Sequence, residues 1–353
     1  MIINRFSLIK RGKGGILAFC PKSLTGGFLN NGSMSLIEQV RTSCRAVAER
    51  ATHVGINHDH IRHYAASLPV DQAISPELDP HIHYLDHGDA TVAYVLILDT
   101  INFGSGYFPY LRKRPGMSGY FSIAASLTDF FKGQGSPTAE QLTQLSLGEC
   151  TRILGQDPDN EIIRELMQLF AAALNELGQY LIAGFRGNYL ELVKAADASA
   201  EHLVSLLVKM PFFNDVEPYD DLNVHFYKRA QLTAADLSIA LKGQGLGFFH
   251  DLHGMTMFAD NLVPHVLRMD GILLYDENLA ARIDSEELIP SGSPEEVEIR
   301  ACALHAVELT AKALKEGGHD VSPVGLDYVL WNRGQQPYYK EVKPRHRTRT
   351  VFY

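Results

Sequence analysis

The stretch "SPEEVEIRACALHAVELTAKALKEGG", residues 293–318, carries the strongest helix signals in the chain. Ser293 is a good N-cap residue, Pro294 suits the first helical position, and Glu296 completes a capping box. Apolar residues then return at helical spacing until Gly317, which is typical of a helix end. We predict one long helix here with a buried apolar side (Val297, Ala301, Leu304, Ala311 and Leu314).

Other helix patterns lie on the N-terminal side of this stretch. "NEIIRELMQLFAAALNELGQYL" (160–181) is amphipathic, and "SLIE" (35–38) is a capping box. "TAAD" (233–236) predicts the start of a helix that ends near Gly243. The apolar run "ATVAYVLILDTINF" (90–103) fits either a buried helix or a strand.

Because helix follows helix with little strand signal, we predict a mostly α fold with minor strands. We expect a single domain over residues 34–353. The Gly-rich residues 1–33 are expected to form an N-terminal extension.

Composition narrows the class of protein. The chain has 353 residues, 46% of them apolar, and its 32 basic and 41 acidic residues give a net charge of −9. This balance argues against broad nucleic-acid binding, so we expect no stable nucleic-acid partner. No apolar run is long enough to span a membrane, and the first residues have no secretory pattern. The four cysteines form no CxxC pair, so we expect free thiols and a cytoplasmic protein.

An isolated acid stands in the apolar stretch "MTMFADNLVPHVLR", residues 255–268. Pro264 cannot donate a hydrogen bond to the carbonyl of Asp260, so a regular helix cannot run through both residues. We predict Asn261 as the N-cap and Pro264 in the first turn, with Asp260 just outside the helix. Asp260 then either faces a ligand that develops positive charge, or only caps the helix or pairs with a cation.

A second acid, Asp327, stands in "GLDYVLWNRGQ" (325–335) beside Tyr328 and the only tryptophan, Trp331. An acid next to aromatic rings suits a flat heterocycle, because the acid accepts N–H bonds and the rings stack. The alternative is a helix N-cap with Leu330 and Trp331 in the core.

Cations gather in two segments. "NVHFYKRAQ" (223–231) places Lys228 and Arg229 beside aromatic residues, which predicts either phosphate binding or a solvated helix face. The tail "KEVKPRHRTRTVFY" (340–353) either guards an anionic site or is a solvated terminus. Its cations are Lys340, Lys343, Arg345, Arg347 and Arg349.

Histidines cluster in "NHDHIRH" (57–63), "HIHYLDH" (81–87) and "FHDLH" (249–253). Such clusters leave a metal-dependent phosphohydrolase open as an alternative. None of them has the spacing of a specific metal motif, so we expect no metal site.

Several segments together resemble the queuosine salvage family. They are "HFYKRAQLTAADL" (225–237), "MTMFADNLVPHVL" (255–267), "EVEIRACALHAVEL" (296–309), "DYVLWNRGQ" (327–335) and "HRTRTVFY" (346–353). "LDTINFGSGYF" (98–108) is similar to a further family segment, and the resemblance spans residues 35–353. It implies a helical domain resembling helix-hairpin-helix DNA glycosylases. It also implies hydrolysis of the N-glycosidic bond of queuosine 5′-phosphate, which releases queuine and ribose 5-phosphate for salvage of queuine into tRNA.

The resemblance also implies residue roles. Asp260 would be the nucleophile or the stabiliser of an oxocarbenium-like sugar, and Phe258 would stack on the departing base. Asp327 and Tyr328, assisted by Asn332, would contact the polar edge of the base. Queuine carries a cationic aminomethyl arm bearing a cyclopentenediol, so an acid near the base also fits its charge.

The remaining roles concern the base and the phosphate. His53, in "ATHVGIN" (51–57), matches a family histidine that contacts the base. Lys228, Arg229 and the tail arginines are the candidates for the phosphate. No metal and no organic cofactor is implied.

Two departures from the family pattern stand out. An aromatic-rich family segment reads Asn-Phe-Gly-Ser-Gly here (102–106), and Asn332 replaces a frequent second acid. Two further alternatives stay open: another nucleotide N-glycosidase, and a non-catalytic binder of modified nucleobases or RNA.

Overall fold

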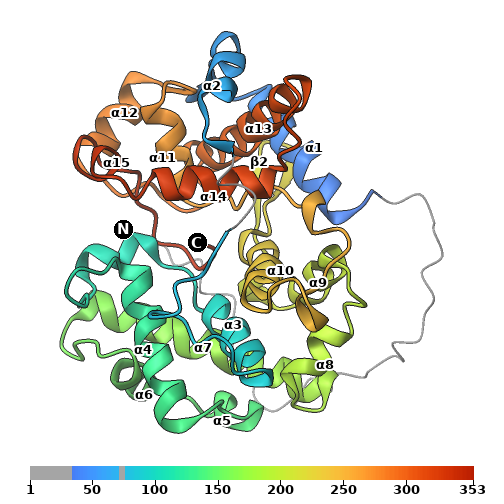
Figure 1. Ribbon diagram of the computed structural model, residues 1–353. Coiled ribbons are helices and arrows are strands. Elements are labelled where there is room, and N and C mark those ends of the chain that lie inside the picture. Colours follow the sequence, from blue (N-terminus) through green and yellow to red (C-terminus); the bar gives the residue numbers. More distant parts are fainter. Residues whose placement is uncertain (1–33, 71–75) are drawn as a thin grey trace. The chain divides into compact units, whose positions relative to one another are not determined.

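Helices make up most of the described chain, so the mostly α prediction is confirmed (Figure 1). The computed structural model describes residues 34–70 and 76–353. The predicted extension, residues 1–33, lies outside the described residues. Residues Ser35–Tyr353 form one compact unit.

The helices before the first hairpin include one buried helix, α3 (Asp89–Thr100). They are α1 (Leu36–Ala48), α2 (Ile61–Ser67), α3 (Asp89–Thr100), α4 (Gly119–Gln134), α5 (Ala139–Thr143), α6 (Leu147–Ile153), α7 (Glu161–Phe185), α8 (Tyr189–Lys194) and α9 (Ala200–Leu207). The apolar run at 90–103 is therefore helical. Every residue from Thr91 to Thr100 is buried, which explains why its sequence shows no polar face.

The remaining helices are α10 (Lys228–Ala240), α11 (Leu262–Met269), α12 (Glu277–Asp284), α13 (Pro294–Glu316), α14 (Pro323–Arg333) and α15 (Pro337–Glu341). The long helix predicted from residue 293 onward is confirmed as α13. The Ser293 side chain accepts the N–H of Glu296, as predicted, but the capping box is incomplete because the Glu296 carboxylate accepts the N–H of Gly292 at 3.0 Å instead. α13 packs against α1, α2, α11 and α14 (Figure 1).

The minor strands form two antiparallel pairs. β1 (Val54–Ile56) pairs with β4 (Leu273–Tyr275), and β2 (Val216–Tyr219) forms a hairpin with β3 (Leu222–His225). None of the helices in the described part of the chain combines the length and the apolar character that crossing a bilayer requires.

The predicted helix start at Thr233 is wrong, because α10 begins at Lys228. The backbone N–H of Lys228 donates to Asp215 Oδ2 at 3.3 Å, so the first turn is held by an acid distant in sequence. Thr233 lies inside the helix, where its hydroxyl donates to the carbonyl of Arg229 at 2.8 Å.

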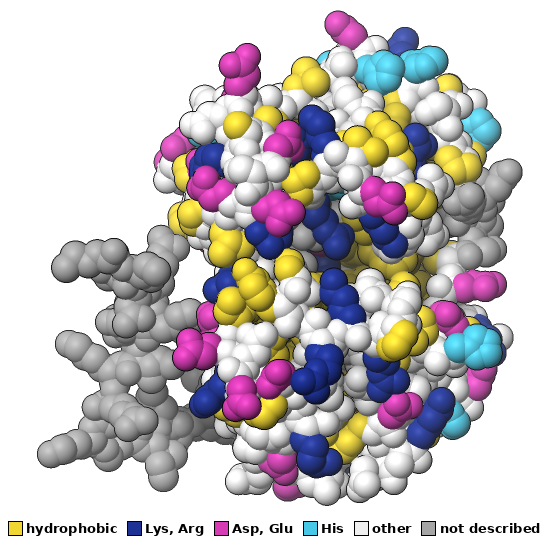
Figure 2. Space-filling view, turned by 90° about the vertical axis from the view of Figure 1, so that its left-hand side faces the viewer, with side chains coloured by type: hydrophobic (Ala, Val, Ile, Leu, Met, Phe, Trp, Pro, Cys, Tyr) yellow, Lys and Arg dark blue, Asp and Glu magenta, His cyan; other side chains and the backbone are white. Residues whose placement is uncertain are grey.

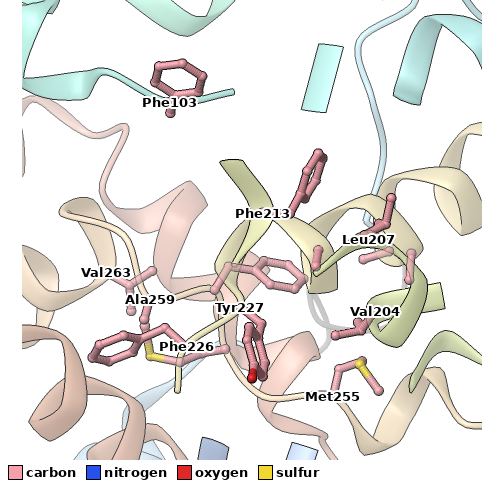
Figure 3. Packing of buried hydrophobic residues seen from close by; sticks show 14 of the residues in the cluster. Phe103, Val204, Leu207, Phe213, Phe226, Tyr227, Met255, Ala259 and Val263 are labelled. Carbon is pink, nitrogen blue, oxygen red and sulfur yellow. The ribbon is translucent and has the colours of Figure 1, made fainter. Parts of the chain in front are cut away.

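Buried side chains from distant segments share one core around α10. Phe103, Phe213, Phe226, Ala259 and Val263 belong to a single cluster of buried hydrophobic residues (Figure 3). This packing supports the segment that carries Asp260, because Ala259 and Val263 flank that acid.

Candidate active site

A cavity of about 350 Å³ lies between α10, α14 and the N-terminal ends of α4 and α11. Its size is within the range of roughly 300–1,000 Å³ that is typical of small-molecule sites. Figure 2 shows one face of the molecule, hollowed across its middle, with Lys and Arg side chains on both sides of the hollow. The predicted site residues that line the cavity are Lys228, Phe258, Asp260, Asp327, Tyr328 and Asn332.

Asp260 stands at the start of α11, as predicted. Asn261 is the N-cap residue and Pro264 lies in the first turn. Asp260 Oδ1 accepts the backbone N–H groups of Leu262 at 2.8 Å and Val263 at 3.1 Å. One carboxylate oxygen therefore caps the helix. Asp260 Oδ2 accepts no hydrogen bond from the residues that the structure describes, and it belongs to a side chain that lines the cavity.

Side chains from other helices fix the segment before Asp260. Gln231 Oε1, on α10, accepts the N–H of Thr256 at 2.9 Å. Arg300 Nε, on α13, donates to the carbonyl of Ala259 at 3.0 Å. Arg300 is itself held by a buried ion pair with Asp215, at 2.6 Å between Nη2 and Oδ2. The position of the Asp260 carboxylate is thus determined by the core.

Asp327 lies in the middle of α14, and its N-cap interpretation is wrong because Ser322 caps that helix. Asp327 is buried, and its Oδ1 accepts the N–H of Phe258 at 2.9 Å. Burial, with the nearby negative charge of Asp260 as the second cause, raises the pKa of Asp327 well above its usual range. Burial therefore favours the protonated form of Asp327, which can donate a hydrogen bond to a ligand.

Two aromatic rings form part of the cavity wall beside these acids. The rings of Phe258 and Tyr328 meet edge to face, with centroids 6.2 Å apart. Trp331 meets Phe121 in the same way at 6.0 Å. These rings offer a flat ligand apolar contact while the acids bind its polar edge.

Lys228 is only 7% exposed, so the solvated-face interpretation is wrong. Burial lowers the pKa of Lys228, and among nearby charges Asp260 opposes this effect most strongly. Its ammonium group lines the cavity and has no hydrogen-bond or ion-pair partner within residues 34–70 and 76–353. Lys228 therefore places a positive charge near Asp260, inside the cavity.

Arg229 does not line the cavity. Its guanidinium donates to the carbonyls of Asp99 and Thr100 at the end of α3. It also lies over the rings of Phe103 and Phe213, at 4.8 and 4.7 Å. These contacts make it a buried cation that satisfies a helix C-terminus, and the structure does not bring it to the other site residues.

His53 also lies outside the cavity lining. Its Nδ1 is 2.6 Å from Asp276 Oδ2, and this hydrogen bond is the main reason that the pKa of His53 is raised. The histidine clusters form no metal-ligand set either: the described residues contain no group of three or more His, Cys, Asp or Glu side chains that could hold a metal ion. His83 is the histidine that lines the cavity, where its Nε2 is 3.0 Å from the Tyr120 hydroxyl.

The basic tail contributes two exposed cations to the cavity, Lys340 and Arg345. Neither has a carboxylate within ion-pair distance in the described part of the chain. The other tail cations pair with acids: Lys343 with Asp284 at 3.6 Å, Arg347 with Glu286 at 3.6 Å, and Arg349 with Glu165 at 4.0 Å.

Sequence reasoning missed Asp236, which lines the cavity and is 5% exposed. Its signal was the helical spacing of Lys228, Leu232, Asp236 and Ile239, all of which line the cavity. That pattern is visible only when the helix begins at Lys228.

The first family departure has a structural explanation. Gly106 lies against the tail, and a Cβ atom there would be 2.3 Å from the carbonyl oxygen of Thr348. The N–H of Gly104, whose φ is +89°, donates to the carbonyl of Tyr353 at 2.8 Å. The two glycines therefore let the C-terminal segment pack beside Asn102, which lines the cavity.

These features define a helical protein whose small-molecule cavity combines buried acids, aromatic rings and a buried lysine. The chain belongs to the queuosine salvage protein family, which it matches over residues 82–353. It is 36% identical over 320 residues to the queuosine 5′-phosphate N-glycosylase/hydrolase of Sphaerobacter thermophilus, an alignment that covers 89% of this chain and 97% of the relative. The Bos taurus protein of the same name is 32% identical over 346 residues, with 89% and 98% covered. The predicted family is confirmed.

Proposed function

We propose that this protein hydrolyses the N-glycosidic bond of queuosine 5′-phosphate and releases queuine and ribose 5-phosphate. The relatives named above support this substrate. The observation that carries the chemistry is the Asp260 carboxylate, held at a cavity wall with one oxygen fixed by two backbone N–H groups. A binder without catalysis gives no reason for such an acid beside a buried lysine.

Asp260 acts on the sugar. As the C1′–N bond breaks, its electron pair leaves with the base and the ribose becomes oxocarbenium-like. Asp260 Oδ2 then either stabilises the cation at C1′ or bonds to it. Water supplies the hydroxyl that ends on C1′ and the proton that ends on the base. Because the carboxylate is fixed before the charge develops, it stabilises the transition state without reorganisation.

The base lies against the aromatic wall. Phe258 stacks on it, while Asp327, Tyr328 and Asn332 contact its polar edge. Since burial favours the protonated form of Asp327, this carboxyl group donates to an acceptor atom of the base and so stabilises the negative charge that leaves with it.

The cations of the cavity contact different parts of the ribose phosphate. Lys340 and Arg345, exposed and without ion-pair partners in the described chain, bind the 5′-phosphate. Lys228 lies deeper, close to Asp260, so it orients that carboxylate and the sugar. Arg229 and His53 have no part in the site.

The substrate is a free nucleotide, so the protein needs no nucleic-acid partner. We place the enzyme in the cytoplasm, where its buried free thiols Cys44, Cys150 and Cys302 stay reduced.

The test is incubation of the purified protein with queuosine 5′-phosphate and a chelator, followed by mass spectrometry. We expect free queuine and ribose 5-phosphate in equal amounts. GMP and AMP serve as comparison substrates, and much faster release of their bases than of queuine would favour a different N-glycosidase. If the folded protein binds queuine but releases no base from any nucleotide, it is a binder.

A further inference from the structure

Beyond Asp260 and Asp327, a second pair of acids lies under the cavity. Asp236 lines it and is 5% exposed, while Asp99, on α3, is fully buried. The two carboxyl groups hydrogen-bond each other. Asp99 Oδ2 is buried and accepts no hydrogen bond from an N–H or hydroxyl group of the described residues. Burial raises the pKa of both acids, and Lys228 is the nearby cation that opposes this effect.

Two phenol groups lie close to this pair. The Tyr120 and Tyr328 hydroxyls both interact electrostatically with Asp236. Tyr328 Oη is buried and has no hydrogen-bond partner within the described residues, although its side chain lines the cavity. An unpaired buried hydroxyl costs free energy in the empty protein, so it marks a position that a ligand group satisfies.

We propose that Asp236, with the Tyr120 and Tyr328 hydroxyls around it, binds the cationic aminomethyl arm of the base and selects substrates that carry it. The proposal rests on the function proposed above and assigns a specificity-determining subsite within the same cavity.

The charge distribution of the cavity supports this placement. Exposed Lys340 and Arg345 line the cavity and attract the phosphate, and the buried carboxyl group of Asp236 lines the same cavity. Queuosine 5′-phosphate has the matching polarity, anionic at the phosphate and cationic at the arm. Complementarity of this kind orients the substrate as well as binding it.

The experiment compares queuosine 5′-phosphate with 7-deazaguanosine 5′-phosphate, which has the same ring and sugar phosphate but no arm. Asp236→Asn keeps the shape of the side chain and a hydrogen bond to Asp99. We expect kcat/KM for the first substrate to fall roughly 10- to 100-fold, as for the loss of a charged hydrogen bond, and kcat/KM for the second to change less than about threefold. Tyr328→Phe should lower kcat/KM for the first substrate by roughly 2- to 10-fold more than for the second, because the base edge that Tyr328 also contacts is common to both.

The matched control is Glu77→Gln, which removes an exposed carboxylate from the same cavity lining. It should leave the ratio of the two kcat/KM values unchanged. The subsite is overturned if Asp236→Asn lowers kcat/KM equally for both substrates or for neither. It is also overturned if Glu77→Gln is the variant that changes the ratio of the two kcat/KM values.

Titration calorimetry with the free bases queuine and 7-deazaguanine covers the case in which the armless nucleotide is not cleaved. Only queuine should lose affinity for Asp236→Asn, and an equal loss for both bases overturns the subsite. If the wild type releases no base from queuosine 5′-phosphate, the proposed function fails. If the wild type releases queuine and Asp236→Asn leaves the ratio of the two kcat/KM values unchanged, only the subsite proposal fails.

Discussion

Replacing Asp260 by Asn tests the chemistry separately from the fold. The amide Oδ1 of Asn can still accept the N–H groups of Leu262 and Val263, which lie at 2.8 and 3.1 Å, so α11 stays capped. Only the negative charge is lost. By analogy with other preorganised electrostatic groups, kcat should fall at least about 10²–10³-fold, or roughly 2.7–4 kcal/mol. Queuine binding should persist. Steady-state rates of queuine release give kcat, and melting temperatures measured in parallel show whether the fold is intact.

Asp260→Ala adds the structural part, because it removes both cap bonds. Loss of an N-cap costs about 0.5–2 kcal/mol, and each kcal/mol lowers Tm by about 2–4 °C in domains of 150–250 residues. Asn160→Ala is the matched control, since Asn160 caps α7 away from the cavity. It should cost similar stability and leave kcat unchanged. An Asp260→Asn enzyme within threefold of wild type would refute the assignment, and so would a rate loss explained by unfolding.

Three further predictions follow from the charges. Joint replacement of Lys340 and Arg345 by Ala should lower kcat/KM for queuosine 5′-phosphate about 10- to 100-fold but leave unphosphorylated queuosine unaffected; equal losses would contradict phosphate binding. Arg300→Met leaves Asp215 buried without its partner and should cost about 3–5 kcal/mol in urea unfolding; a cost under about 1 kcal/mol would mean that this pair does not hold the Asp260 segment. Burial raises the pKa of Asp99 from 3.8 to about 7, so the folded state binds more protons than the unfolded state between these values, and stability falls as pH rises through them. The Asn side chain of Asp99→Asn cannot ionise, so this variant should lose less stability than the wild type from pH 4 to pH 7. An equal loss in the free energy of urea unfolding for the two proteins would contradict this.

Local chemistry made parts of the fold predictable. The cap at Ser293 and the conflict between Pro264 and Asp260 are each settled within one or two helical turns, and both predictions are confirmed. The start of α10 was not predictable in this way, because the group that holds its first turn is Asp215, on a different segment. Missing that start hid Asp236, whose spacing from Lys228 becomes meaningful only on a continuous helix.

Neighbours in sequence also diverge in space. Lys228 and Arg229 are adjacent, yet successive residues of a helix point about 100° apart. One lines the cavity and the other binds the end of α3. A pattern of two adjacent cations cannot show which of them meets a ligand, since that depends on which elements pack against each side of the helix.

The acids in and under the cavity differ in burial. Asp99, Asp236 and Asp327 are each at most 5% exposed, and burial raises the pKa of all three. Asp260 is the partly exposed member, and its Oδ1 accepts two backbone N–H groups at a helix start. If all four acids were ionised, Lys228 could not offset their repulsion. In the proposed mechanism, the packing that buries the other three acids leaves Asp260 as the acid that acts on C1′.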